Sequence, residues 1–137
     1  MPERDLTDAP KIFSPEYYAG MRALESGAWW NAGMRSIAAS LLNTVSLPAS
    51  GRFLDAGCGS GQTIKWLASR LPQLTGYGVD ISQDAVAAAS HDGHSVGIGS
   101  VLSLPFQDDA FELVISLDVL QHMPLEGGDL TAAREIR

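Results

Sequence analysis

Two spacings of apolar residues divide the chain near residue 50. Between residues 34 and 47, apolar side chains recur every three or four positions, which predicts a helix with one apolar face; they are Met34, Ile37, Ala38, Leu41, Leu42 and Val45. Upstream, Ser14-Pro15-Glu16 is typical of a helix start, with serine as N-cap and proline at the first helical position. The first ten residues hold two prolines and alternating charges, which predicts a loose arm.

After Gly51, short apolar runs alternate with helical patterns about ten residues long. The runs predict strands over residues 52–55, 74–80, 94–98 and 111–117, and the patterns between them predict helices over 62–71 and 82–90. The run 111–117 is nearly continuous, as in a strand buried on both faces. Alternating strands and helices form parallel βαβ units, so we predict an α/β fold.

The pattern at the end of the chain predicts a sheet that lacks a strand beside its last one. Leu130, Ala133 and Ile136 begin another helical face, and the chain ends at Arg137. If 111–117 is the last strand, its outer side is an apolar edge, which proteins normally cover or pair. We interpret this as a truncated domain, or as one that a second copy or a partner chain completes.

Composition narrows the class of protein. Sixteen acidic residues against nine basic ones give a net charge of −7 and no basic patch, which disfavours nucleic acid as a partner. A single cysteine argues against disulfides and against a multi-cysteine zinc site, so no metal site is predicted. No apolar run is long enough to span a membrane, and residues 1–10 do not resemble a signal peptide. We expect a soluble, cytoplasmic, single-domain protein.

The chemistry is concentrated in residues 54–61, between the first predicted strand and the helix after it. Gly57, Gly59 and Gly61 allow a sharp turn that comes close to a ligand, and the N-terminus of the following helix favours an anionic group. Asp80 follows 19 residues after Gly61, at the end of the second strand, where a carboxylate can accept hydrogen bonds from ribose hydroxyls. Together these features predict a nucleoside-containing ligand above the strand ends.

The glycine spacing departs from the dinucleotide fingerprint and resembles motif I of class I S-adenosylmethionine-dependent methyltransferases. Three later segments resemble further motifs of that family in the same order, namely residues 78–82, 99–106 and 109–122. The resemblance covers residues 50–136. It implies a Rossmann-like parallel sheet of strand order 3-2-1-4 without the family's C-terminal strands. Residues 1–50 would form an arm and helical cap, and residues 51–137 the cofactor-binding portion.

The resemblance also implies roles for individual residues near the turn. Gly57, Cys58 and Gly59 would lie against the methionine part of S-adenosylmethionine, whose carboxylate suits the helix N-terminus. Asp55 would face the ammonium group of the cofactor, directly or through water. Asp80 would hold the ribose hydroxyls. For Cys58 we prefer the interpretation of a small residue that fits the turn over that of a reactive thiol.

The remaining implied contacts are on the adenine and methionine sides. Ile81 would pack on the adenine ring, and Val101 would offer it a backbone N–H. Ser100 stands where the family commonly has an aspartate that accepts from the adenine amino group, so adenine discrimination is open. Leu117 would line the methionine side. No catalytic residue is predicted except His122 as a candidate base, and we prefer a capping or packing role for it.

Several residues have a plainer interpretation than a place in the site. The aromatic residues Tyr17, Tyr18, Trp29 and Trp30 either bury a helix against the core or form a lid over the site. His91 and His94 flank a turn and are expected to be solvated, and Asp108 and Asp109 to form a charged turn. Asp118 is expected to begin a helix rather than to act in catalysis.

The sequence therefore predicts methyl transfer from S-adenosylmethionine to a small molecule, with no nucleic acid or membrane partner. The alternative is a catalytically incomplete cofactor-binding fragment or subunit that needs a partner chain. A nicotinamide-dependent oxidoreductase is disfavoured because the glycine spacing is wrong for a dinucleotide.

Overall fold

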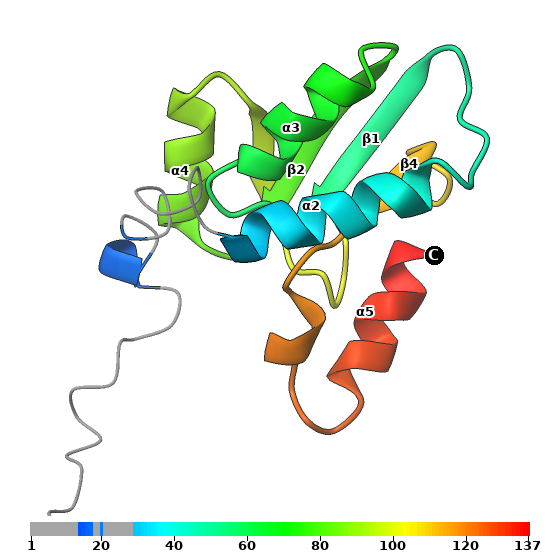
Figure 1. Ribbon diagram of the computed structural model, residues 1–137. Coiled ribbons are helices and arrows are strands. Elements are labelled where there is room, and N and C mark those ends of the chain that lie inside the picture. Colours follow the sequence, from blue (N-terminus) through cyan, green and yellow to red (C-terminus); the bar gives the residue numbers. More distant parts are fainter. Residues whose placement is uncertain (1–13, 18–19, 21–28) are drawn as a thin grey trace, which may run out of the picture.

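The computed structural model describes residues 14–17, 20 and 29–137 (Figure 1). The elements of this part are, in chain order, α2 (Trp29–Leu42), β1 (Gly51–Ala56), α3 (Gln62–Arg70), β2 (Leu74–Asp80), α4 (Gln83–His91), β3 (Ser95–Ile98), β4 (Leu113–Ile115), η2 (Leu120–His122) and α5 (Gly128–Ile136). Tyr18 and the predicted arm at residues 1–10 lie outside the described residues. No helix in the described part is long and apolar enough to cross a membrane.

The four strands form one parallel sheet of order β3-β2-β1-β4, which confirms the predicted fold class and strand order. β1 lies between β2 and β4, with Phe53 opposite Gly76 on one side and Leu113 on the other. The chain places β2 and β3 on one side of β1 and then crosses back to place β4 on the other side, so the strand order reverses between β1 and β4. Crevices at such a point, above the carboxyl ends of the strands, are where open α/β sheets bind ligands.

Alternate residues of β1 serve the two faces of the sheet. Phe53 packs with Ile64 and Leu67 of α3 on one face, and Leu42 of α2 borders this cluster. Leu54 and Ala56 pack on the other face with Ala132 of α5. Because both faces are covered, β1 is buried from Phe53 to Ala56 and forms the rigid base of the ligand-binding edge.

The predicted strand 111–117 is shorter and less buried than expected. Only Leu113–Ile115 is extended and paired, and all three residues are half-buried rather than buried on both faces. The physical reason is position, because no other described strand pairs with the outer side of β4. An apolar run fits a strand buried within a sheet and one at an edge equally well.

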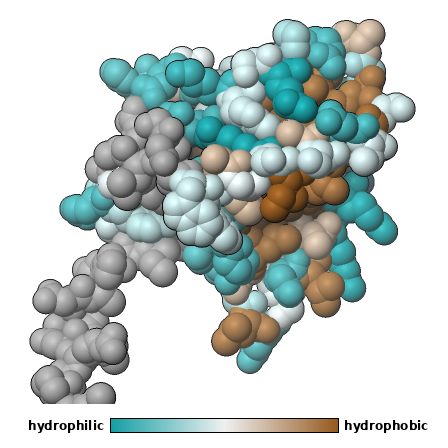
Figure 2. All heavy atoms as spheres, viewed as in Figure 1, coloured by the Kyte–Doolittle hydropathy of each residue, from teal (hydrophilic) through white to brown (hydrophobic). Residues whose placement is uncertain are grey.

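The predicted bounds of one helix and the predicted buried faces of two helices were wrong. α2 begins five residues before the predicted start and ends at Leu42, and Ile37 and Leu41 remain 62% and 63% exposed. In α5 the buried positions are Gly128 and Ala132, while the predicted face residue Leu130 is exposed. Ala132 packs with Leu54 and Ala56 of the sheet, and a Cβ on Gly128 would meet Pro124 and Met123. The spacing of larger apolar residues does not reveal these contacts through small ones. Figure 2 shows apolar surface gathered over the middle and right of this face of the molecule.

Serine side chains cap two helical segments, and the cap at Ser14 confirms the predicted helix start. The hydroxyl of Ser82 accepts a hydrogen bond from the Ala85 N–H at 3.3 Å at the start of α4. Ser14 accepts from the Tyr17 N–H at 3.1 Å at the beginning of the short helical turn upstream. Both bonds satisfy amide groups that a helix N-terminus leaves without an intrahelical acceptor.

Gly78 of β2 tests how tightly the turn after β1 packs on the sheet. A Cβ at this position would lie 2.6 Å from Ile64 Cδ1 and 2.8 Å from Cys58 Sγ. We expect Gly78→Ala to lower the free energy of unfolding by about 1–3 kcal/mol through overpacking. Gly97→Ala in β3 is the matched control, because nothing lies within 4 Å of its added methyl group. Urea unfolding followed by circular dichroism measures both; equal effects of the two substitutions would contradict this packing.

Candidate functional site

A cavity of about 380 Å³ opens at the carboxyl ends of the strands. Its size is within the roughly 300–1,000 Å³ of small-molecule pockets. Segments that follow each of the four strands line it, namely residues 57–59, 80–81, 99–102 and 117–119. Tyr17, α2, α3 and the segment 122–124 supply the rest of the described lining.

The structure brings together eight of the nine predicted cofactor-binding residues around this cavity, and His122 with them. The eight are Gly57, Cys58, Gly59, Asp80, Ile81, Ser100, Val101 and Leu117. Asp55 is the exception: it does not line the cavity and is only 2% exposed, near the end of β1. Its carboxylate is therefore enclosed by protein and is not part of the cavity wall.

The glycine turn has a left-handed backbone at three alternate positions. The φ angles are 88° at Gly57, 51° at Gly59 and 85° at Gly61, a region that strongly favours glycine. A Cβ on Gly57 would also lie 2.5 Å from Val119 Cγ2, so the segment after β4 packs directly on the turn. The turn thus needs glycine for its conformation and, at Gly57, for a close contact.

Asp80 fixes the turn to the end of β2. One carboxylate oxygen accepts from the Gly59 N–H at 2.9 Å, and the other accepts from the Ser82 N–H at 2.9 Å. The side chain is buried but lines the cavity. A carboxylate has about four acceptor positions, so Asp80 can hold these two amides and still accept from hydroxyl groups of a ligand.

Cys58 has the environment of an inert thiol. Burial raises the pKa of the Cys58 thiol far above its ordinary value, and the nearby carboxylates of Asp55 and Asp80 raise it further. Because the thiolate is the reactive form of cysteine, this site suppresses nucleophilic chemistry. This environment agrees with the interpretation of Cys58 as a small residue that fits the turn rather than as a reactive thiol.

Ser100 shapes the loop after β3. Its hydroxyl accepts from the Leu102 N–H at 3.1 Å, and its carbonyl accepts from the Ser103 N–H at 3.1 Å. The hydroxyl proton can still be donated, so Ser100 differs in chemistry from the acceptor-only aspartate expected from the family. Val101 is buried beside it at the cavity wall.

Two polar residues outside the motifs differ in how well they match the expectations. Asp118 has a left-handed backbone, with φ of 60°, and its carboxylate accepts from the side chain of Gln121. It lies near the start of η2, as expected, but the N-cap of that helix is Val119. His94 was expected to be solvated, which is wrong: it is half-buried, and a Cβ on Gly61 would lie 2.6 Å from its Cδ2. Its ring packs against the turn because Gly61 has no side chain.

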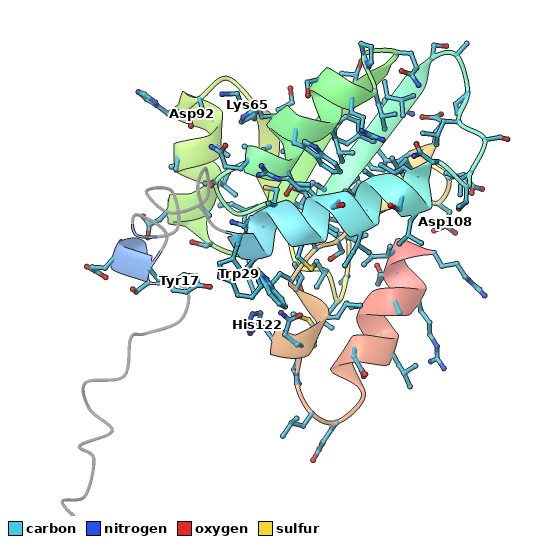
Figure 3. The ribbon with its side chains drawn as sticks, in the orientation of Figure 1. Tyr17, Trp29, Lys65, Asp92, Asp108 and His122 are labelled. Carbon is cyan, nitrogen blue, oxygen red and sulfur yellow. The ribbon has the colours of Figure 1, made fainter. Side chains whose placement is uncertain are left out.

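Of the described N-terminal aromatic residues, Trp29 and Trp30 do not bury a helix against the core. Trp29 and Trp30 are 81% and 51% exposed and meet edge to face, with ring centroids 5.9 Å apart. Tyr17, by contrast, lines the cavity, as does His122. Figure 3 shows both side chains near the N-terminal end of α2, where Trp29 begins the helix. Of the two alternatives, Tyr17 agrees with the lid.

Sequence reasoning missed the contribution of α2 to the cavity. Asn31, Met34 and Arg35 line it from one side of that helix. Their spacing of three and four residues is typical of one face of a helix. Because this face mixes polar and apolar residues, a search for apolar periodicity does not find it. The missed lining residues elsewhere are Gln62, Thr63, Gly99, Leu102, Asp118, Val119, Met123 and Pro124.

Comparison with known proteins agrees with this geometry. Residues 54–136 match the model of a family described as a methyltransferase domain. The chain is 33% identical over 91 residues to a tRNA (carboxymethyluridine(34)-5-O)-methyltransferase of Arabidopsis thaliana, covering 66% of this chain and 22% of that protein. It is 32% identical over 89 residues to trans-aconitate 2-methyltransferase of Variovorax paradoxus, covering 64% and 34%.

Among solved structures, the fold is similar to phosphoethanolamine N-methyltransferase 2 of Haemonchus contortus, crystallised with S-adenosyl-L-methionine. The TM-score is 0.71 at 19% identity, over 93% of this chain and 31% of that one. The chain thus spans about a third or less of each of these three proteins. The family match covers more than half of the chain and includes every element from β1 to α5 except the first residues of β1, and we conclude that the chain belongs to the methyltransferase-domain family.

Proposed function

We propose that this chain binds S-adenosylmethionine and directs transfer of its methyl group to a small-molecule acceptor. The observation that carries the proposal is the Asp80 carboxylate, held by two backbone amides at the wall of a cavity that a three-glycine turn also lines. A carboxylate in this position suits the paired hydroxyls of a ribose. The family match supports the reaction class.

The residues around the cavity fit the parts of this cofactor. We assign the ribose to Asp80 and the adenine to Ile81, Ser100 and Val101, with Ile81 exposed at the wall as a stacking surface requires. The methionine part is assigned to Gly57, Cys58, Gly59 and Leu117. The buried carboxylate of Asp55 favours the cofactor's ammonium group through its charge. In this assignment residues 51–137 form the cofactor-binding portion, and α2, within the arm and helical cap predicted over residues 1–50, supplies part of the wall.

The cofactor supplies an activated methyl group on a sulfonium, so the protein's work is to position the two reactants and exclude water. The apolar side chains of Leu117, Val119 and Met123 line the wall after β4, where they exclude water. Tyr17 and His122 line the same cavity. Where the acceptor is a hydroxyl, His122 is our candidate for the base that takes its proton.

The net charge and the cavity size favour a small-molecule acceptor. The charge of −7 repels the phosphates of RNA, and the described lining has one arginine and no lysine. A tRNA is the second candidate, since one relative is a tRNA methyltransferase, whereas another is named for trans-aconitate. Both relatives are much longer than this chain.

We also propose that a second copy or a partner chain covers the outer side of β4. Leu113 and Ile115 pack on one face of the sheet and Val114 on the other, yet all three stay half-buried. An uncovered apolar edge presents amide and carbonyl groups to any other strand. If methyl transfer requires that partner, the chain alone binds the cofactor and turns over poorly, which is the fragment hypothesis.

The cofactor assignment predicts how binding responds to Asp80→Ala. We expect micromolar binding of S-adenosylhomocysteine by the chain, weakened about tenfold or more by the substitution, which corresponds to about 1.4 kcal/mol. Asp84→Ala removes an exposed carboxylate four residues away and is the control for charge. Titration calorimetry on samples shown to be folded measures all three proteins. A folded wild-type sample that does not bind would contradict the proposal.

The acceptor class predicts where label from methyl-tritiated S-adenosylmethionine goes. With total tRNA and a protein-free small-molecule extract supplied in separate reactions at physiological salt, we expect label to move only into the extract. The reason is that the net negative charge of the chain repels the phosphates of RNA. Reactions without protein set the background. Transfer to tRNA alone would overturn the small-molecule assignment.

The β4 edge predicts self-association. Sedimentation velocity from low to high micromolar concentration should show a shift from monomer toward dimer, because pairing buries an apolar edge. The same series with S-adenosylhomocysteine present controls for effects of the cofactor site. A single monomer at all concentrations would refute association between copies and leave a different partner chain to be tested.

A further inference from the structure

Asp118 has a backbone conformation that residues other than glycine rarely adopt. Its φ of 60° lies in the left-handed region, where a Cβ comes too close to the following carbonyl oxygen. Among the described residues, Asp109 is the one other non-glycine residue with a left-handed backbone. The two differ in position, because Asp118 lines the cavity and Asp109 does not. A strained residue at a ligand cavity is a candidate functional residue.

The residues on either side of Asp118 hold the chain in place. The Ser116 hydroxyl donates to the Ala56 carbonyl at 2.8 Å, which joins the end of β4 to the end of β1. Val119 packs on the glycine turn, since a Cβ on Gly57 would lie 2.5 Å from Val119 Cγ2. These two contacts fix the path of the chain between them. The conformation of Asp118 is therefore set by its neighbours, and a glycine there would relieve the strain.

What the aspartate adds over glycine is a carboxylate at the solvent side of the cavity. Asp118 is exposed, and its carboxylate accepts a hydrogen bond from the side-chain amide of Gln121. A carboxylate has about four acceptor positions, so this bond orients the group and leaves it able to accept others. Asp80, the other carboxylate of the described lining, is buried, holds two amides and is assigned to the ribose. Asp118 is thus the lining carboxylate that remains for a second ligand.

We infer that Asp118 selects the methyl acceptor by binding a protonated amine on it, an inference that rests on the proposed function. An ammonium group and a carboxylate attract each other by charge and form N–H···O hydrogen bonds. The net charge of −7 raises the concentration of small cations around the chain and so favours the same class of ligand. Leu117, the preceding residue, is assigned to the methionine part of the cofactor. An amine bound at Asp118 therefore brings the acceptor to the methyl-bearing end of the cofactor.

Three probes of similar shape and different charge test this inference. They are 2-phenylethylamine, 2-phenylethanol and 3-phenylpropanoate, titrated into protein saturated with S-adenosylhomocysteine and followed by NMR of the protein amides. We expect the wild-type protein to bind the amine most tightly. Asp118→Asn should weaken the amine about three- to fivefold, as for an exposed ion pair, and change the alcohol by less than about twofold. Asp118→Gly should lose the same affinity without a fall in melting temperature, because glycine fits the left-handed backbone.

Asp109 supplies matched controls for both substitutions. Asp109→Asn and Asp109→Gly make the same changes of charge and side chain at an exposed, left-handed position outside the cavity. Neither should change the affinity for the amine. A loss as large as that of the Asp118 variants would mean that the net charge of the chain, rather than Asp118, holds the amine.

The remaining outcomes separate the inference from the function on which it rests. If Asp118→Asn left the affinity for the amine unchanged, or if none of the three probes bound, the inference would be overturned. Tighter binding of 3-phenylpropanoate than of the amine would also overturn it and would favour an acidic acceptor at Arg35, the one arginine or lysine of the described lining. If the wild-type protein did not bind S-adenosylhomocysteine at all, the proposed function itself would fail, and the inference with it.

Discussion

The site depends on one carboxylate that joins two consecutive βα units. Asp80 ends β2 and accepts from the Gly59 N–H in the turn after β1 and from the Ser82 N–H at the start of α4. These bonds hold two turns at a fixed separation above neighbouring parallel strands. Because the side chain is buried, water competes weakly for it, and its conformation is set before any ligand arrives. The ribose position in our assignment follows from this preorganised group.

The same constraint explains why the surroundings are small and apolar. The turn must fold back on the sheet so that its amides reach Val79 and Asp80, and this brings Cys58 against Gly78. A larger residue at either place would separate the turn from β2. Burying Cys58 between two carboxylates in turn removes its reactivity. The site therefore works by positioning a ligand between charged side chains, and the turn carries no activated nucleophile.

Features that a strong local sequence pattern encodes were predicted correctly. Features that depend on tertiary packing were missed or predicted wrongly. The glycine turn and Asp80 followed from motif spacing and the strand order from the family resemblance, and all were found. The predicted burial of β4 and the predicted buried face of α5 were wrong. The burial of an edge strand and of a small residue such as Ala132 depends on which other elements cover it. The role of α2 was missed for a related reason. Arg35 lies about twenty residues before the turn, and only the folded chain shows that it reaches the same cavity.

The most direct test of the account is a crystal structure of the chain with S-adenosylhomocysteine. The account predicts both ribose hydroxyls within hydrogen-bonding distance of the Asp80 carboxylate, with the Gly59 and Ser82 amides still bonded to it. It predicts the adenine against Ile81 and the methionine part against Gly57, Gly59 and Leu117. A ligand bound elsewhere, or one that displaces the Gly59 amide from Asp80, would contradict the claim that this preorganised carboxylate defines the site.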